Sequence, residues 1–134
     1  MMLCLPQLPH FKNFSLEKLK TYNKETLASK VIRFTGQIVR REEYSNRVDG
    51  VFDTYIGLQI ADIGNIEQKM ILDYVDTFTA NIVNIIVLLD NLNNDLENIE
   101  KLRLICEFLG YNKNEKISIL RQILERDYLN LQWV

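Results

Sequence analysis

The sequence has few of the residues that staple small secreted domains or bind metal ions. Among 134 residues there are two cysteines, Cys4 and Cys106, and a single histidine, His10. A disulfide-stabilised secreted scaffold normally has more cysteines, so we expect two free thiols in a reducing, cytoplasmic compartment. A structural zinc site needs four cysteine or histidine ligands at close spacing, which these three distant residues do not provide. We therefore expect neither a metal ion nor another cofactor.

Sequence motifs for catalysis are also scarce. None of the five glycines stands in a GxGxxG or GxxxxGKS/T pattern, so no phosphate-binding loop is predicted. His10 is flanked by Pro9 and Phe11, a setting in which a histidine more often packs than transfers protons. Asp73 and Asp76 are three residues apart and would be neighbours on a helix, where a solvated face is the commoner role for such a pair. No catalytic residue is predicted, and we expect that the protein is not an enzyme.

A long apolar run is missing as well. The most apolar stretch covers residues 82–89, contains Asn84 and ends at Asp90, whereas a membrane-spanning helix needs about 20 apolar residues. The N-terminal segment is apolar but lacks basic residues and is broken by Pro6 and Pro9, which argues against a secretion signal. We expect a soluble protein that has no membrane partner.

The composition that remains is that of an ordinary globular protein, with 47% hydrophobic and 25% charged residues. A chain of this size buries one hydrophobic core, so we predict a single domain over residues 1–134. Residues 1–14 hold both prolines and show no sustained period, which predicts an irregular N-terminal arm. Ser15 and Glu17 are typical of a helix start, and a helix is expected over residues 15–29.

The strongest pattern is an apolar repeat in the second half of the chain. Apolar residues recur at alternating spacings of four and three, which places them on one face of a helix. They are Ile71, Val75, Phe78, Ile82, Ile85, Leu89, Leu92, Leu96 and Ile99. Between Phe78 and Leu89 the other faces are apolar too, through residues such as Val83 and Val87. A helix near 66–92, buried nearly all round, is therefore predicted at the centre of the core.

Two shorter helices are predicted after it. Asn94 with Glu97, and Asn112 with Glu115, have the spacing of a capping box, which marks a helix start. Gly110 suits the left-handed position that ends a helix. The segment 95–127 is therefore expected to form an αα-hairpin.

Residues 30–62 allow two interpretations. Val31, Phe34 and Ile38 have helical spacing, but apolar and polar residues also alternate here, and β-branched residues are frequent. The helical interpretation would place Lys30, Arg33, Gln37 and Arg40 on one face. We predict a mainly α fold, a small bundle of four to five helices. The alternative is an α+β fold with a β-hairpin within 31–61.

Charge is distributed unevenly along the chain. Residues 1–50 carry nine basic and five acidic side chains, whereas residues 51–134 carry seven and thirteen, which together give the net charge of -2. Basic residues stand beside aromatic ones in the first half, a mixture that suits contacts with phosphates and bases. The candidates for nucleic-acid contact are Lys30, Arg33, Arg40, Arg41 and Arg47.

The apolar content exceeds what one short bundle is expected to hide. Exposed apolar area usually marks a partner site, and tryptophan is enriched at binding hot spots. Leu129, Leu131 and Trp133 make the end of the chain unusually apolar and are the candidate protein interface. The sequence therefore predicts a non-enzymatic interaction or regulatory module that forms a homodimer and binds another protein of unknown identity. A small nucleic-acid-binding regulator is the alternative.

Overall fold

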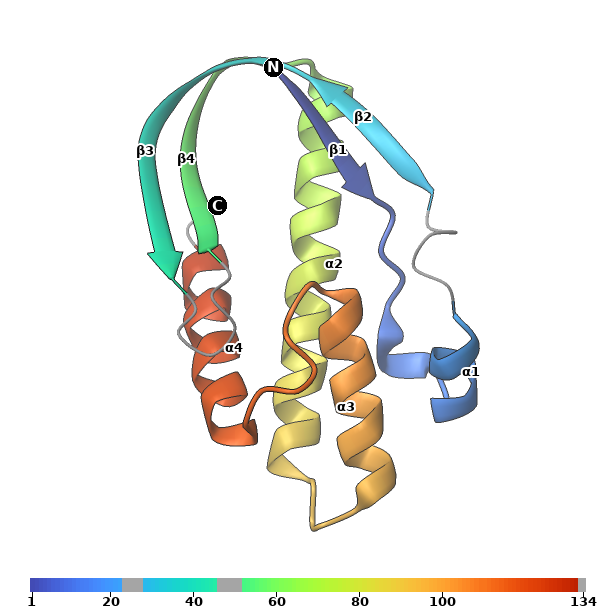
Figure 1. Cartoon of the computed structure of the whole chain (residues 1–134). Coiled ribbons are helices and arrows are strands. Elements are labelled where there is room, and N and C mark those ends of the chain that lie inside the picture. The colour runs from blue at the N-terminus through green and yellow to red at the C-terminus, as the bar shows by residue number, and fades with distance from the viewer. Residues whose placement is uncertain (23–27, 46–51, 133–134) are drawn as a thin grey trace. The chain divides into compact units, whose positions relative to one another are not determined.

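The computed structural model describes residues 1–22, 28–45 and 52–132, and for residues 41–45 and 52–56 it describes the backbone only (Figure 1). The fold is mixed, with four α-helices and two antiparallel strand pairs among the described residues. The chain divides into two compact units. Residues 1–5 and 30–71 form one, the β unit, and residues 6–29 and 72–134 form the other, the helical unit.

The helical unit is built from α1 (Leu16–Thr21), most of α2 (Asn65–Asp90), α3 (Leu96–Phe108) and α4 (Ile117–Leu131). The central helix that the sequence predicts is thus confirmed, and two further helices follow it. Residues 109–116 join α3 and α4, and the two helices run in the same direction, so the predicted αα-hairpin over 95–127 is wrong (Figure 1). Ile82 and Ile85 are fully buried, and Leu89 is nearly so. They pack in one core with Phe11, Phe14, Leu19, Leu102, Ile105, Cys106, Leu109, Leu120 and Leu124.

Helices α3 and α4 each begin later than their predicted capping boxes indicate, by one residue for α3 and by several for α4. Asp95, rather than Asn94, caps α3 by accepting a hydrogen bond from the Glu97 N–H at 2.9 Å. Asn94 instead takes a left-handed φ of 58° in the turn that precedes the cap. The prediction for Gly110 is confirmed, since it has a φ of 91° after α3.

The connection between α3 and α4 is held by an arginine that the sequence did not single out. The Arg103 guanidinium of α3 donates to the carbonyl of Lys113 at 2.6 Å and to the carbonyl of Glu115 at 2.8 Å. These two hydrogen bonds tie the loop to α3. Helix α4 begins at Ile117 rather than near Asn112.

The first helix is shorter than predicted. Ser15 caps α1 as expected, accepting a hydrogen bond from the Lys18 N–H, but the helix ends at Thr21. Tyr22 is extended, and residues 29–33 form strand β2 instead of continuing a helix. The N-terminal arm is also more ordered than predicted, because it contains strand β1 (Met2–Pro6) and the 3-10 helix η1 (Phe11–Asn13).

A buried asparagine fixes the N-terminal arm to α2 inside the helical unit. The Asn81 side chain is 1% exposed; its Oδ1 accepts from the Phe11 N–H and its Nδ2 donates to the Pro9 carbonyl, both at 3.0 Å. Phe11 then packs with Phe14, Tyr22 and Phe108 in an aromatic cluster. One polar side chain thus satisfies two backbone groups of an otherwise irregular segment.

The β unit contains both strand pairs. β1 lies beside β2 (Ser29–Arg33), and the antiparallel pairing continues where Met1 and Phe34 exchange two backbone hydrogen bonds. β3 (Thr35–Ser45) pairs with β4 (Phe52–Asp62) as a long antiparallel hairpin. The preferred helical interpretation of residues 30–62 is therefore wrong, and the β-hairpin alternative is the one that the structure contains.

The physical reason lies in the pairing of side chains across the strands. Ile38 lies opposite Leu58 and Gln37 opposite Gln59, so apolar residues meet apolar ones on one face and polar residues meet on the other. Such cross-strand pairs stabilise a sheet, and they depend on residues 20 positions apart that a local helical period does not take into account.

Candidate protein-interaction surface

One face of the β3–β4 hairpin is apolar and exposed. Leu58 and Ile60 are two residues apart in β4 and point to the same side of the sheet, and Ile38 of β3 lies directly opposite Leu58. The exposed fractions of these side chains are 53% for Ile38, 43% for Leu58 and 42% for Ile60. We call these three residues the apolar hairpin face.

The apolar hairpin face was only partly visible in the sequence. The alternation of Leu58 and Ile60 with polar neighbours indicates a half-buried strand, and a half-buried strand is expected to turn its apolar side inward. In the structure that side is exposed within the described residues. Two strands alone are marginally stable in water, so such a face requires cover from another element or another molecule.

The predicted interface at the end of the chain is only partly exposed. Leu129 lies on α4 with 62% of its side chain exposed. Leu131 is partly buried and packs against the helical core, so it is not available as a free contact. Trp133 lies outside the described residues. Of the three, Leu129 alone is placed on the surface.

The predicted basic residues are not brought together on a helix face. Lys30 and Arg33 are exposed on β2, where positions three apart point to opposite sides of a strand. Arg40 is exposed on β3, Arg41 is placed there by its backbone alone, and Arg47 lies outside the described residues. The shared face expected for Lys30, Arg33, Gln37 and Arg40 is thus a wrong prediction, because the segment is β rather than α.

The charge of the hairpin segment also disfavours phosphate contact. Residues 35–62 contain three basic side chains, at positions 40, 41 and 47, against five acidic ones, at positions 42, 43, 49, 53 and 62. The difference is a net charge of -2 over the segment that was to supply most of the basic contacts. Neutralising DNA or RNA phosphates requires an excess of basic side chains.

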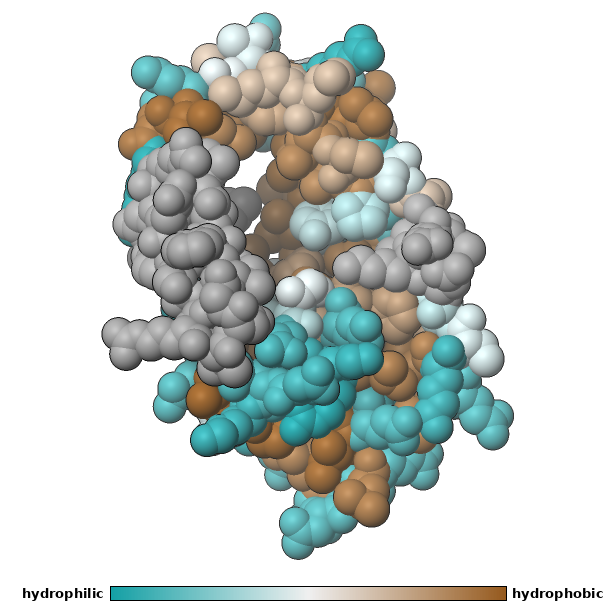
Figure 2. All heavy atoms as spheres, in the orientation of Figure 1, coloured by the Kyte–Doolittle hydropathy of each residue, from teal (hydrophilic) through white to brown (hydrophobic). Residues whose placement is uncertain are grey.

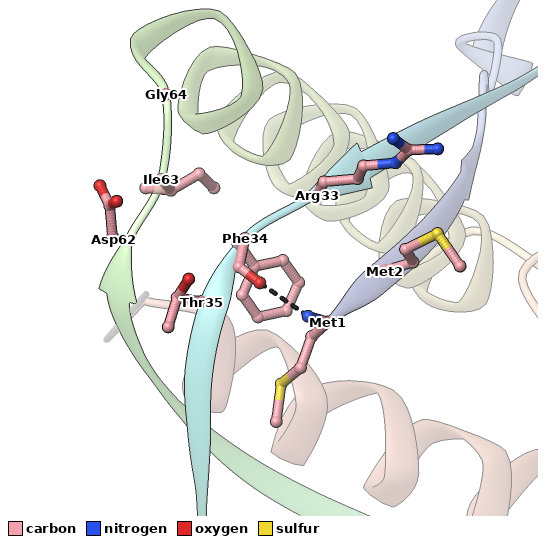
Figure 3. A pocket seen from close by; sticks show the side chains of 8 residues that line it. All are labelled: Met1, Met2, Arg33, Phe34, Thr35, Asp62, Ile63 and Gly64. Atoms are coloured by element: carbon pink, nitrogen blue, oxygen red, sulfur yellow. Dashed lines mark hydrogen bonds between the residues drawn. The ribbon is translucent and has the colours of Figure 1, made fainter.

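An open hollow of about 380 Å³ lies in the β unit (Figure 3). Its lining consists of Met1, Met2, Arg33, Phe34, Thr35, Asp62, Ile63 and Gly64. The Arg33 and Asp62 side chains are exposed and point away from each other in the view of Figure 3. The hollow is thus lined by two unbranched methionine side chains and has separate charges at its rim. Its described lining holds no pair of groups arranged to transfer a proton.

The candidate carboxylates and thiols do not meet in this hollow. Asp73 and Asp76 are both exposed on α2. Cys4 is exposed, whereas Cys106 is fully buried. Burial raises the pKa of the Cys106 thiol to about 12, against a smaller lowering by the nearby Arg103 charge. A thiol held in its protonated form is a poor nucleophile.

Helix α2 is exposed along one side. By length and composition it is one helix of the described chain that could cross a membrane, yet its Ile82, Ile85 and Leu89 side is buried in the helical core. Val83 and Val87 are 41% and 51% exposed, so the prediction of a helix buried nearly all round is wrong. Apolar side chains accordingly lie on the surface in several places (Figure 2).

No protein-family model, curated protein or solved structure matches this chain.

Proposed function

We propose that the protein is a non-enzymatic interaction or regulatory module that forms a homodimer and binds another protein. The observation that carries this proposal is the exposure of the apolar hairpin face. Leaving apolar area in water costs roughly 25 cal/mol per Å², so association that covers Ile38, Leu58 and Ile60 is favourable. Such association also provides the additional packing that a two-stranded sheet needs to be stable in water.

A second apolar surface in the helical unit supports a contact with a different protein. Val83 and Val87 are one turn apart on α2, so they form a short exposed ridge. Leu129 is the exposed member of the contact predicted at the end of α4. Val83, Val87 and Leu129 belong to the helical unit, whereas the apolar hairpin face belongs to the β unit. The partner is expected to present an apolar patch of its own.

Sedimentation velocity over a concentration series tests the first half of the proposal. We expect the weight-average mass to rise from that of the 15.8 kDa chain toward twice that value. The double variant Leu58→Ser and Ile60→Ser should shift this transition to higher concentration, while Leu96→Ser, which alters an 80% exposed leucine on α3, should not. A wild-type protein that stays monomeric throughout the series contradicts the proposal.

A titration against mixed DNA and RNA at low ionic strength tests the alternative function, a small nucleic-acid-binding regulator. Binding through Lys30, Arg33, Arg40, Arg41 and Arg47 would weaken steeply as salt is added. Because residues 35–62 carry a net negative charge, we expect no such salt-dependent binding. Tight low-salt binding that Arg33→Ala and Arg40→Ala reduce would favour the nucleic-acid regulator instead.

A further inference from the structure

The β3–β4 hairpin has two outer edges, and neither is hydrogen-bonded to another strand among the described residues. Each strand is 11 residues long, so each edge presents a row of backbone N–H and C=O groups outward. Long open edges are templates for pairing with another chain unless the sequence protects them. The chemistry of the two edges therefore decides where a further strand is added.

Strand β3 carries two of the features that protect an edge. Four consecutive charged residues, from Arg40 to Glu43, lie in its middle. The register also shifts between Ile38 and Arg40, so Val39 is an extra residue that forms a β-bulge in β3. Charges and bulges on an edge strand oppose regular pairing with another strand.

Strand β4 lacks this protection. From Thr54 to Ile60 it contains no charged residue, and its backbone runs through these positions without an extra residue of its own. The register irregularity in β4 comes only beyond Ile60, before Asp62 pairs with Thr35. A long, uncharged and regular edge is the kind that accepts a further strand.

From this difference we infer that a second copy of the chain joins through β4, whose edge pairs antiparallel with its own counterpart. The product is a four-stranded sheet with the two β3 strands outside. The inference rests on the proposed homodimer and names the strand edge through which the two copies pair. Cross-strand neighbours then cover part of the apolar hairpin face of each copy. Four strands with one apolar face meet the condition for independent stability that the isolated hairpin fails.

The sequence of β4 is compatible with pairing to itself. In an antiparallel register centred on Gly57, the uncharged stretch from Thr54 to Ile60 lies opposite the same stretch of the second copy. No two like charges then lie opposite each other along β4, because position 53 meets Ala61. Directly opposed residues point to the same side of a sheet, so the apolar hairpin faces of both copies merge into one.

Cross-linking of a matched pair of cysteine variants tests which edge is used. Ile38 and Leu58 lie opposite each other in the hairpin and are both exposed, so Ile38→Cys and Leu58→Cys place a thiol at the same level on different strands. The exposed Cys4 is replaced in both by Cys4→Ser. Across the inferred dimer the two β4 strands are separated by about 5 Å, and the two β3 strands by about 14 Å.

A bismaleimide with a two-carbon spacer should therefore link Leu58→Cys into covalent dimers at least about fivefold faster than Ile38→Cys. Faster linkage of Ile38→Cys would place the contact at the β3 edge, and equal rates would indicate face-to-face packing; either result overturns the inference. A wild-type dimer in which neither variant is linked overturns it while the proposed homodimer stands. A wild-type monomer in sedimentation defeats both.

Lysines on the two edges give a second test that does not alter the apolar hairpin face. Gln37 and Gln59 are exposed register partners, so Gln37→Lys and Gln59→Lys add the same charge to opposite edges. Gln59→Lys should weaken the dimer at least about fivefold, because a charge on the pairing strand opposes regular addition of a second strand, whereas Gln37→Lys should leave its dissociation constant unchanged. An equal effect of both variants, or none from Gln59→Lys, contradicts pairing through β4.

Discussion

In the helical unit, apolar residues from η1, α1, α2, α3 and α4 meet in one buried core. In the β3–β4 hairpin, Ile38, Leu58 and Ile60 share a face that remains between 42% and 53% exposed. Both regions have the amphipathic pattern of their secondary structure, with period 3.6 in the helices and period 2 in the strands. They differ in what packs against the apolar side.

The difference shows that an amphipathic pattern predicts where an apolar face lies, but does not predict what packs against it. Three helices and an N-terminal arm surround Ile82 and Ile85, so these residues stabilise the chain that carries them. The hairpin has one layer, and we propose that the same kind of residue there stabilises an assembly instead. Four sets of variants sharpen this comparison.

The largest effect is expected from truncating the helical core. Leu102 on α3 is fully buried, and Leu102→Ala should lower the free energy of unfolding by about 3 kcal/mol through lost burial and a residual cavity. Leu96→Ala on the same helix alters a side chain that is 80% exposed and should cost less than about 0.5 kcal/mol. Urea denaturation of both variants measures the difference, and similar losses would contradict a closed helical core.

The next effect concerns two asparagines one turn apart on α2. Asn81→Ala leaves the Phe11 N–H and the Pro9 carbonyl without their partner, which should cost about 2 kcal/mol. Asn84 is the matched control, because its buried Nδ2 has no hydrogen-bond partner among the described residues. Asn84→Ala should therefore cost much less or be neutral. Thermal denaturation of the two variants is the measurement, and an equal loss would refute the role given to Asn81.

Alkaline pH should destabilise the helical unit through Cys106. Its folded pKa of about 12 lies above the ordinary value of 9.0, so the thiolate forms first in the unfolded chain. The contribution of the protonated Cys106 thiol to the free energy of unfolding is complete below pH 9 and is lost as the pH rises toward 12. Between pH 8 and pH 10 this loss amounts to about 1 kcal/mol.

Denaturation at several pH values, compared between wild type and Cys106→Ala, isolates that contribution. The variant should show the shallower decline, although its stability at pH 8 is lower because a side chain is removed from the core. Cys4→Ser, which alters an exposed thiol, should follow the wild-type profile. Parallel curves for wild type and Cys106→Ala would show that this thiol does not titrate on unfolding.

The smallest effect on stability is expected in the hairpin. Ile60→Ser removes an apolar side chain that is 42% exposed and should lower the free energy of unfolding of the monomer by less than about 1 kcal/mol. The same change should weaken self-association by a larger factor, because Ile60 lies on the strand that pairs with the second copy in the inferred dimer. Denaturation well below the dimer dissociation constant, compared with sedimentation, separates the two. A loss of monomer stability as large as that of Leu102→Ala would mean that the chain covers this face itself.

Local pattern predicted the helical part of the fold well. The spacing through Ile82 and Ile85 specifies a helix near 66–92, and α2 covers residues 65–90. Gly110 ends α3 as its conformational freedom requires. These features depend on residues within one or two turns, which is the range over which periodicity and capping act.

The candidate site was predicted less completely. Leu129 is exposed as expected, but Leu131 is partly buried against the core, and the apolar hairpin face was not identified as a surface. Burial depends on what the remaining chain places against a residue, and no local spacing contains that information. The basic residues were likewise assigned to one helical face that β-pairing replaced by two sides of a strand.

The sequence by itself determined the amphipathic helices of the second half and the position of Gly110, because each depends on near neighbours in the chain. It also shows the alternation of apolar residues in 30–62. Only the tertiary structure decided that residues 35–62 pair as a hairpin, that Asn81 holds the N-terminal arm, and that one apolar face is buried while another stays open. These outcomes require contacts between residues about 20 to 70 positions apart, and such contacts form only once the whole chain has folded.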